Sequence, residues 1–170
     1  MTDVFSPEKR SSVMARIRSK DTKPELLIRK ALHARGYRFR LHRKDLPGRP
    51  DIVLPRYRTV IFVHGCFWHA HANCHLAVMP HSNEAFWAKK LSANRQRDIR
   101  NVEDLETMGW RVLIIWECAC QKSRLNGLMS LVEDFLHGSI ADNRRDIGRD
   151  DVTVAGRHGP RCQQGEIAPS

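Results

Sequence analysis

Apolar residues at helical spacing predict four helices along the chain. The clearest lies in TKPELLIRKALHARGY, where apolar residues stand four apart, Pro24 falls in the first turn and Gly36 can end the helix. In the longest predicted helix, Ile99, Val102 and Leu105 share one face. The predicted helices cover residues 6–21, 22–37, 82–109 and 127–140.

Runs of β-branched and other apolar residues predict the strands. DIVLP (51–55) and TVIFVHG (59–65) flank the short polar link RYR, which is typical of a β-hairpin. WRVLIIWECAC (110–120) is apolar almost throughout, as in a strand that is covered on both faces. Helices alternating with strands predict an α/β fold with a mixed central β-sheet flanked by helices.

The composition changes near residue 140. Residues 1–139 are predicted to form one domain, and residues 140–170, polar and rich in glycine, a disordered C-terminal tail. The stretch MTDVFSPEKR lacks the apolar core of a signal peptide, and no segment is apolar enough to cross a membrane. We therefore expect a cytoplasmic protein with no membrane contact.

The charge of the chain points to nucleic acid. The formal net charge is +10, and residues 8–44 hold thirteen lysines and arginines against three acidic residues. A basic surface of this kind binds phosphate backbones by releasing counterions. The alternative is a solvated basic face with no specific partner.

The stretch HGCFWHAHANCH (64–75) combines metal-ligating residues at short spacing. Five cysteines in a chain without an export signal favour metal ligation or free thiols over disulfides. Cys66, His71 and Cys74, with Cys118 from the later strand, would form a closed Cys3His site, and a closed site holds structural Zn²⁺. The alternative is unrelated buried thiols beside a surface histidine. Rival ligands are Cys120, His69 and His75.

Asp51 follows a proline at the start of the predicted hairpin. This arrangement resembles the nuclease core in which a Pro-Asp pair begins one strand and an acid-x-Lys motif follows on its partner. A carboxylate there would hold Mg²⁺ against the scissile phosphate. Phe62, Val63 and His64 stand where acid-x-Lys would be, so Val63 can offer only its main-chain carbonyl.

A nuclease without the second acid needs another group to carry protons. His64 and His69 are the candidates, because imidazole titrates near neutral pH. Glu25, on the predicted second helix, could orient a water or a histidine. Each has an alternative: Asp51 could cap a turn, His64 could be a hydrogen-bonded core residue, and Glu25 is a common first-turn acid.

Phe67 and Trp68 stand between the proposed zinc ligands, and Trp87 starts the longest helix. Exposed aromatic side chains on a basic protein can wedge between base pairs and open the duplex. The alternative for all three residues is packing in the core.

Four motifs together resemble the very-short-patch-repair (Vsr) DNA mismatch endonucleases of bacteria. They are LPGRPDIVLP, VIFVHGCFWHAH, FWAKK and MGWRVLIIWEC, and the resemblance covers roughly residues 5–138. It implies a restriction-endonuclease-like core and a monomer that nicks the thymine-bearing strand 5′ of a T·G mismatch in double-stranded DNA. Such mismatches arise by deamination of 5-methylcytosine, which implies a functional link to a cytosine-5 methyltransferase and to mismatch-repair proteins.

The resemblance also implies roles for single residues. Asp51 and the main-chain carbonyl of Val63 would bind Mg²⁺, and His64, His69 and Glu25 would act in catalysis. Cys66, His71, Cys74 and Cys118 would bind Zn²⁺, and Phe67, Trp68 and Trp87 would intercalate. Asn73 is a departure, because it looks like one extra residue between two ligands and requires the loop to bulge.

Two other functions fit parts of this pattern. One is a restriction-type endonuclease on the same core that cuts DNA without a mismatch. The other is a zinc-stabilised DNA-binding module without catalysis, which the missing second acid allows. Binding alone requires neither Asp51 nor the two histidines, so their presence favours an enzyme.

Overall fold

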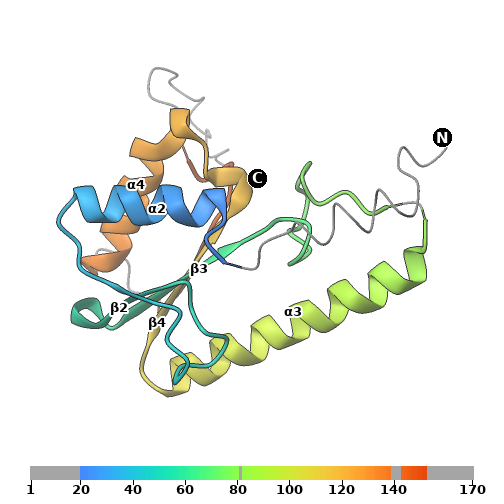
Figure 1. The fold of residues 1–170 in the computed structure, drawn as a ribbon, viewed down its shortest axis with the longest axis horizontal. Coiled ribbons are helices and arrows are strands. Elements are labelled where there is room, and N and C mark those ends of the chain that lie inside the picture. Colours follow the sequence, from blue (N-terminus) through green and yellow to red (C-terminus); the bar gives the residue numbers. More distant parts are fainter. Residues whose placement is uncertain (1–19, 81, 139–142, 153–170) are drawn as a thin grey trace, which may run out of the picture.

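A five-stranded mixed sheet forms the centre of the molecule. The computed structural model describes residues 20–80, 82–138 and 143–152. The strand order is β1-β2-β3-β4-β5; β1 pairs with β2 and β2 with β3 antiparallel, while β3 pairs with β4 and β4 with β5 parallel. The strands are β1 (Arg40–Leu41), β2 (Ile52–Leu54), β3 (Thr59–His64), β4 (Arg111–Trp116) and β5 (Arg144–Ile147). The predicted α/β architecture is confirmed (Figure 1).

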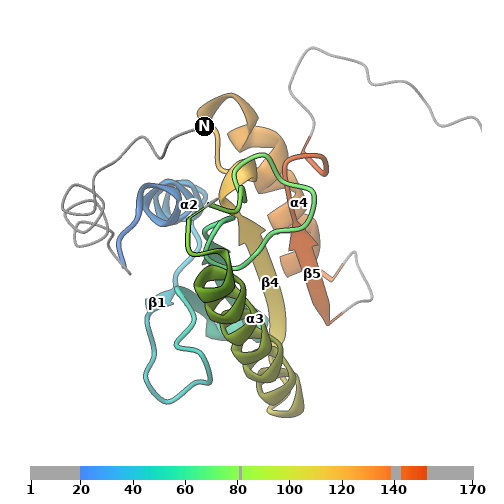
Figure 2. The same cartoon turned by 90° about the vertical axis from the view of Figure 1, so that its right-hand side faces the viewer.

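The α-helices in the described ranges cover both faces of this sheet. α2 (Lys23–Ala34) and α4 (Leu125–Leu136) lie on one face, and α3 (Glu84–Thr107) lies on the other (Figure 2). α2 begins as predicted, because the Thr22 hydroxyl accepts the N–H of Glu25 (3.4 Å). Among these helices, none combines the length and the apolar character needed to span a bilayer.

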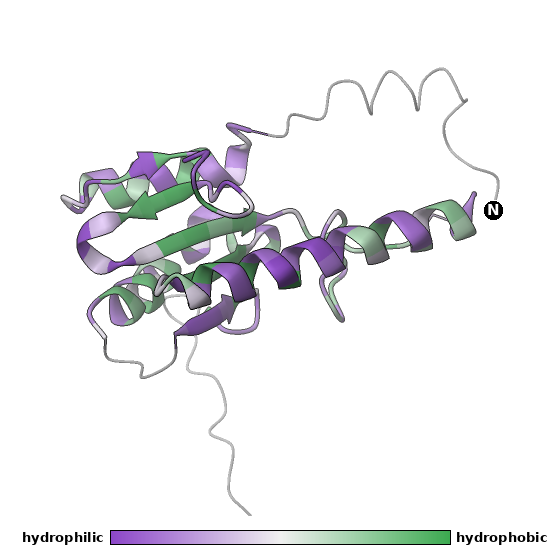
Figure 3. Ribbon diagram, turned by 90° about the horizontal axis from the view of Figure 1, so that it is seen from below, coloured by the Kyte–Doolittle hydropathy of each residue, from purple (hydrophilic) through white to green (hydrophobic). Residues whose placement is uncertain are grey.

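Alternate residues of β3 and β4 belong to two separate apolar cores. Ile61 and Leu113 pack into the core under α2 and α4, and Val60 and Val112 pack into the core under α3. Both strands are therefore covered on both faces, and Figure 3 shows their hydrophobic band beside the largely hydrophilic α3. His64 follows the alternation of Val60, so its side chain lies on the α3 face.

The predicted hairpin is confirmed. Ile52 of β2 pairs opposite Ile61 of β3, and the link contains the short 3₁₀ helix η1 (Pro55–Tyr57). Arg58, in the left-handed region with φ 50°, then turns the chain into β3. The hairpin places the residues before β2 beside the end of β3.

α3 matches the predicted helix but contacts the sheet over only part of its length. Its N-terminal part projects away from the sheet, as Figure 1 shows, while Val102 and Leu105 are buried in the core. Ile99, which was predicted to share a face with these two residues, is 40% exposed.

Residues 143–152, which the composition assigned to a disordered tail, complete the sheet and its core. β5 pairs with β4, Ile147 lies opposite Ile115, and both Ile147 and Val152 pack under α4. The segment is mostly charged because its strand lies at the sheet edge. Of the predicted helix 6–21, residues 20 and 21 are not helical, and residues 6–19 lie outside the described ranges, as do 153–170.

Candidate active site and metal centre

Asp51 lies just before β2 and faces the end of β3. The turn LPGRP brings it there: Gly48 has φ +69°, and a Cβ at Gly48 would lie 2.8 Å from the Asn101 side chain of α3. Oδ2 of Asp51 accepts the N–H of Val63 (2.8 Å), and Oδ1 lies 3.8 Å from Nδ1 of His42. Burial raises the pKa of Asp51 to about 7, although the Val63 N–H opposes this shift.

Glu25 lies close to Asp51 but its carboxylate is already bonded. It accepts hydrogen bonds from Arg29 Nη2 (2.7 Å), the Thr22 hydroxyl (2.9 Å) and the N–H of Asp21 (3.0 Å). Glu25 is only 2% exposed. The negative charge of Glu25 raises the pKa of Asp51, and the positive charge of Arg29 lowers it. The charges of both residues therefore influence the ionisation of Asp51.

His64 and His69 stack on one another beside this hairpin. Their ring centroids are 3.8 Å apart with an angle of 5° between the planes. Nδ1 of His69 lies 2.6 Å from Oδ2 of Asp98 on α3. His69 also lowers the pKa of Asp51 through its charge, which links the histidine pair to the carboxylate. Burial lowers the pKa of His64 to about 3, so this imidazole is neutral near pH 7.

Asp98 is a site residue that sequence reasoning missed. It stands 29 positions after His69, on the polar side of a long charged helix, and nothing local separates it from other exposed acids. Packing of α3 against the loop creates the contact. Arg29 and His42 were missed for the same reason. Arg29 on α2 contacts His42 after β1, and His42 lies near Asp51 of the hairpin, so these contacts form only when separate elements pack together.

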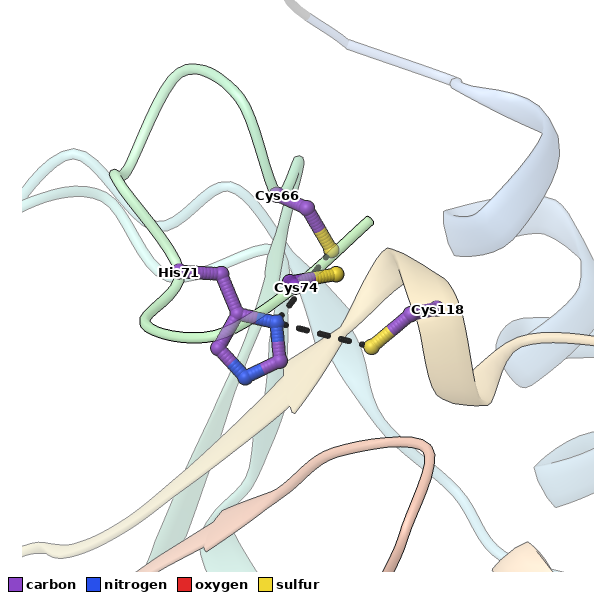
Figure 4. Close-up of side chains that lie close together, drawn as sticks. All are labelled: Cys66, His71, Cys74 and Cys118. Carbon is purple, nitrogen blue, oxygen red and sulfur yellow. Dashed lines mark hydrogen bonds between the residues drawn. The ribbon is translucent and has the colours of Figure 1, made fainter. Parts of the chain in front are cut away.

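Cys66, His71, Cys74 and Cys118 converge as the spacing predicted. One ligand atom from each lies within 4.8 Å of all the others. Figure 4 shows the loop after β3 supplying three of them and the short turn after β4 supplying Cys118. Nδ1 of His71 is 3.5 Å from Sγ of Cys66 and 3.5 Å from Sγ of Cys118.

Asn73, which the resemblance predicted to be one extra residue, has a left-handed backbone. Its φ is 54°, and Ala70, just before His71, also has a positive φ of 50°. Asparagine tolerates this conformation better than most residues. With this backbone, Cys74 lies within reach of the other three candidate ligands.

The rival ligands lie outside this cluster. β4 ends at Trp116, earlier than predicted, and the 3₁₀ helix η2 (Glu117–Ala119) carries Cys118. The predicted strand from 110 to 120 would point Cys118 and Cys120 the same way, but the turn separates them, and Cys120 Sγ donates to the Trp116 carbonyl (3.5 Å). His69 is bonded to Asp98.

The donor set fits a tetrahedral ion. With Zn–S near 2.3 Å and Zn–N near 2.0–2.1 Å, a tetrahedron needs S···N separations of about 3.6 Å. The two S···N distances of 3.5 Å match this value. Burial raises the pKa of the Cys66 and Cys118 thiols, so these thiols are protonated near neutral pH unless a metal ion binds.

The three proposed intercalating residues pack together. The ring centroid of Phe67 lies 5.2 Å from that of Trp68 and 5.3 Å from that of Trp87. The main-chain carbonyl of Trp68 accepts a hydrogen bond from the Asn94 side chain (3.0 Å). Trp87 is only 7% exposed, whereas its neighbour Phe86 is 57% exposed. Phe67 and Trp68 are partly exposed on the loop that carries the metal ligands.

Comparisons with known proteins give the family. The family model described as DNA mismatch endonuclease Vsr matches residues 2–76. The type II nicking enzyme V.XorIIP of Xanthomonas oryzae is 50% identical over 139 residues, which is 82% of this chain and 100% of that protein. The DNA mismatch endonuclease Vsr of Escherichia coli K12 is 40% identical over 149 residues, 86% of this chain and 95% of that protein. The chain therefore belongs to the Vsr family of DNA mismatch endonucleases.

Proposed function

We propose that this protein is a Mg²⁺-dependent endonuclease that nicks the thymine-bearing strand 5′ of a T·G mismatch. The family and the names of the relatives support DNA as the substrate and phosphodiester hydrolysis as the reaction. The observation that carries the proposal is one juxtaposition: Asp51, the His69–Asp98 pair and the Phe67–Trp68 loop adjoin the end of β3. A binding module needs no such set. The proposal includes a restriction-endonuclease-like core, a monomer, and substrates that arise from 5-methylcytosine.

Asp51 is the residue that would hold Mg²⁺, with the main-chain carbonyl of Val63. The Val63 N–H orients Oδ2 of Asp51. Among the described residues, Oδ1 accepts no hydrogen bond, and its polar neighbour is Nδ1 of His42 at 3.8 Å. Burial raises the pKa of this half-buried carboxylate to about 7 despite the positive charges of Arg29 and His69, and a bound divalent cation would stabilise its ionised form. Mg²⁺ takes one or two protein oxygens. When bound, it would polarise the scissile phosphate and neutralise charge on the leaving oxygen.

His69 is the better candidate for the general base. Its Nδ1 faces the Asp98 carboxylate, which holds the proton on that nitrogen and leaves Nε2 free to accept a proton from water. The water oxygen then bonds to phosphorus as the bond to the leaving oxygen breaks. His64 is buried and neutral, and its stacked ring fixes the plane of His69.

Cys66, His71, Cys74 and Cys118 would hold a structural Zn²⁺. All four positions come from the protein, which leaves no ligand position open for substrate. The ion would join the loop after β3 to the turn after β4. Phe67 and Trp68, on that loop, are the residues that would enter the base stack, and Trp87 would support them from α3.

Nicking of a T·G duplex by the Asp51→Asn variant tests the chemistry. Asparagine keeps an oxygen to accept the Val63 N–H but removes the charge that a divalent cation needs. We expect nicking only with Mg²⁺ or Mn²⁺ and a loss of at least 10³-fold in the variant, with unchanged DNA binding. Binding without nicking by the wild type would favour the DNA-binding module.

A further inference from the structure

Arg29 and His42 connect Glu25 to Asp51 through a series of polar contacts, and neither residue has a role in the proposed reaction. Arg29 Nη2 lies 2.7 Å from Glu25 Oε2 and 2.8 Å from Nε2 of His42. On the other side of the ring, Nδ1 of His42 lies 3.8 Å from Asp51 Oδ1. His42 therefore stands between the guanidinium and the carboxylate that would bind the catalytic cation.

The guanidinium determines the tautomer of His42. Arginine has N–H donors and no acceptor, so Nε2 of His42 must accept from Arg29. The proton of a neutral His42 then lies on Nδ1, the nitrogen that faces Asp51. His42 is thus oriented to present an N–H to Oδ1, while the Val63 N–H is bonded to Oδ2.

Both oxygens of the Glu25 carboxylate accept hydrogen bonds from neighbouring residues. Oε1 accepts from Thr22, and Oε2 accepts from both Asp21 and Arg29. These bonds cap α2 and hold Arg29. Besides the direct effect of its charge on the pKa of Asp51, Glu25 can therefore act on Asp51 through Arg29 and His42.

The backbone around His42 supports a dedicated role. His42 has φ 46°, a left-handed conformation that is uncommon outside glycine. It immediately follows β1, whose Leu41 pairs with Ile52 next to Asp51. The sheet thus places the strained residue beside the carboxylate, and such strain concentrates at functional sites.

Asp21, Glu25 and His42 also meet the geometric criterion for a cation site. The Arg29 guanidinium bonds to all three of them, so the positive charge at this position comes from the protein. A metal ion there would have to displace a side chain that is 7% exposed. The cluster is better explained as a support for Asp51 than as a third metal centre.

We propose that His42 is a positioning residue, held by the Glu25–Arg29 pair, which orients the free oxygen of Asp51 toward the catalytic cation. This inference rests on the proposed function only in the assignment of Asp51 as the cation-binding carboxylate. It makes Glu25 a positioning residue as well, acting at a distance from the reacting atoms.

The test compares His42→Leu with His42→Gln. A glutamine amide can accept from Arg29 with its oxygen and donate to Asp51 with its nitrogen, whereas leucine can do neither. Mn²⁺ affinity is measured by titration calorimetry on the protein bound to T·G duplex at a pH where nicking is slow, and kcat and KM for nicking are measured separately. Thermal unfolding of both variants controls for folding.

We expect His42→Leu to weaken Mn²⁺ binding about tenfold and to lower kcat about tenfold with KM for DNA unchanged. His42→Gln should restore both values to within threefold of wild type. Leucine and glutamine variants that are equally impaired, or a leucine variant that matches wild type, would overturn the proposal. If wild type nicks no duplex, the proposed function fails, and the Mn²⁺ affinities of the three proteins still decide the role of His42.

A double-mutant cycle tests the extension to Glu25. Glu25→Gln alone should lower kcat, because a weaker hold on Arg29 releases His42. In the His42→Leu background the same change should have less than a twofold further effect on kcat. Independent, multiplicative losses would show that Glu25 does not act through His42.

Discussion

His69 and Asp98 form a hydrogen-bonded pair in which the carboxylate decides which ring nitrogen carries the proton. The bond is short, 2.6 Å, and it joins the loop after β3 to α3. Stacking on His64 fixes the plane of the ring. The groups that orient His69 should therefore matter to its proposed role as a general base as much as the imidazole itself.

Asp98→Asn should lower kcat for nicking by about 10²-fold, the low end of what general acid–base catalysis contributes. The amide keeps the size of the side chain but lacks the negative charge that would stabilise the imidazolium formed when His69 accepts a proton. Single-turnover nicking of a T·G duplex measures the effect. Asp104→Asn is the matched control, because this exposed residue lies on the same helix outside the site. An Asp98→Asn variant as fast as the control would refute the role of the pair.

Sequence reasoning identified residues whose chemistry depends on local spacing. Cys66, His71 and Cys74 lie within nine positions, and Asp51 follows a turn motif, so their types and order were informative. The sequence did not identify Asp98 or His42, because their contacts form only when separate elements pack together. A single aspartate among many charges on α3 carries no local signal.

The position at which β4 ends determines which cysteine belongs to the Cys3His cluster. β4 ends at Trp116, and η2 turns Cys118 toward His71 while Cys120 points back to the strand. The apolar run from 110 to 120 predicted one longer strand, because nothing in its hydrophobicity marks the turn. Hydrophobic pattern predicts that an element exists better than it predicts where it ends.

Cys118→Ser should lose bound zinc, and Cys120→Ser should keep it. Removing one thiolate opens a closed site that ties two elements together, so the Cys118 variant should also unfold at a lower temperature. Metal analysis of the purified proteins gives the zinc content directly. Equal zinc loss in both variants would mean that the two cysteines exchange as ligands.

β5 is the element that composition alone failed to predict. Its sequence RRDI contains one apolar residue, and that residue, Ile147, is fully buried against the sheet. An edge strand needs apolar character on only one face, so a short charged segment can still complete a core. Its neighbour Gly148 lies close to His71, since a Cβ there would be 3.3 Å from that ring.

A chain ending at residue 142 should be less stable than one ending at 152 by about 3–5 kcal/mol. The shorter chain loses the buried side chains of Ile147 and Val152 and the pairing with β4. The longer chain keeps every described contact of this segment. Urea unfolding of both proteins measures the difference, and equal midpoints would show that β5 adds nothing to the fold.

Across the described part of the molecule, the sheet brings the proposed catalytic residues and the proposed intercalating residues to one end. Asp51 lies just before β2, and β3 ends with His64. The loop after β3 supplies His69 and the aromatic pair, and α3 contacts this loop through Asp98 and Asn94. The Cys3His cluster joins that loop to the end of β4. A rigid loop of this kind would couple opening of the base stack to placement of the phosphate.

Trp68→Ala should reduce the preference for T·G over C·G duplex in binding by about tenfold. Stacking of one base on an aromatic ring contributes roughly 1–3 kcal/mol, and the gain is larger where the pair is already weak. Fluorescence anisotropy with both labelled duplexes gives the ratio. Met108→Ala serves as the control, because it removes an exposed apolar side chain at the opposite end of α3. An unchanged ratio for Trp68→Ala would exclude this wedge.

Strand-resolved nicking tests the central claim most directly. Duplexes identical except for one T·G or C·G pair, labelled on either strand and varied in flanking sequence, are incubated with Mg²⁺ and with wild-type or Asp51→Asn protein. We predict nicks only in the thymine-bearing strand, 5′ of the mismatch, and only with Asp51 present. Equal cutting of the matched C·G duplex would contradict mismatch specificity and favour a restriction-type endonuclease.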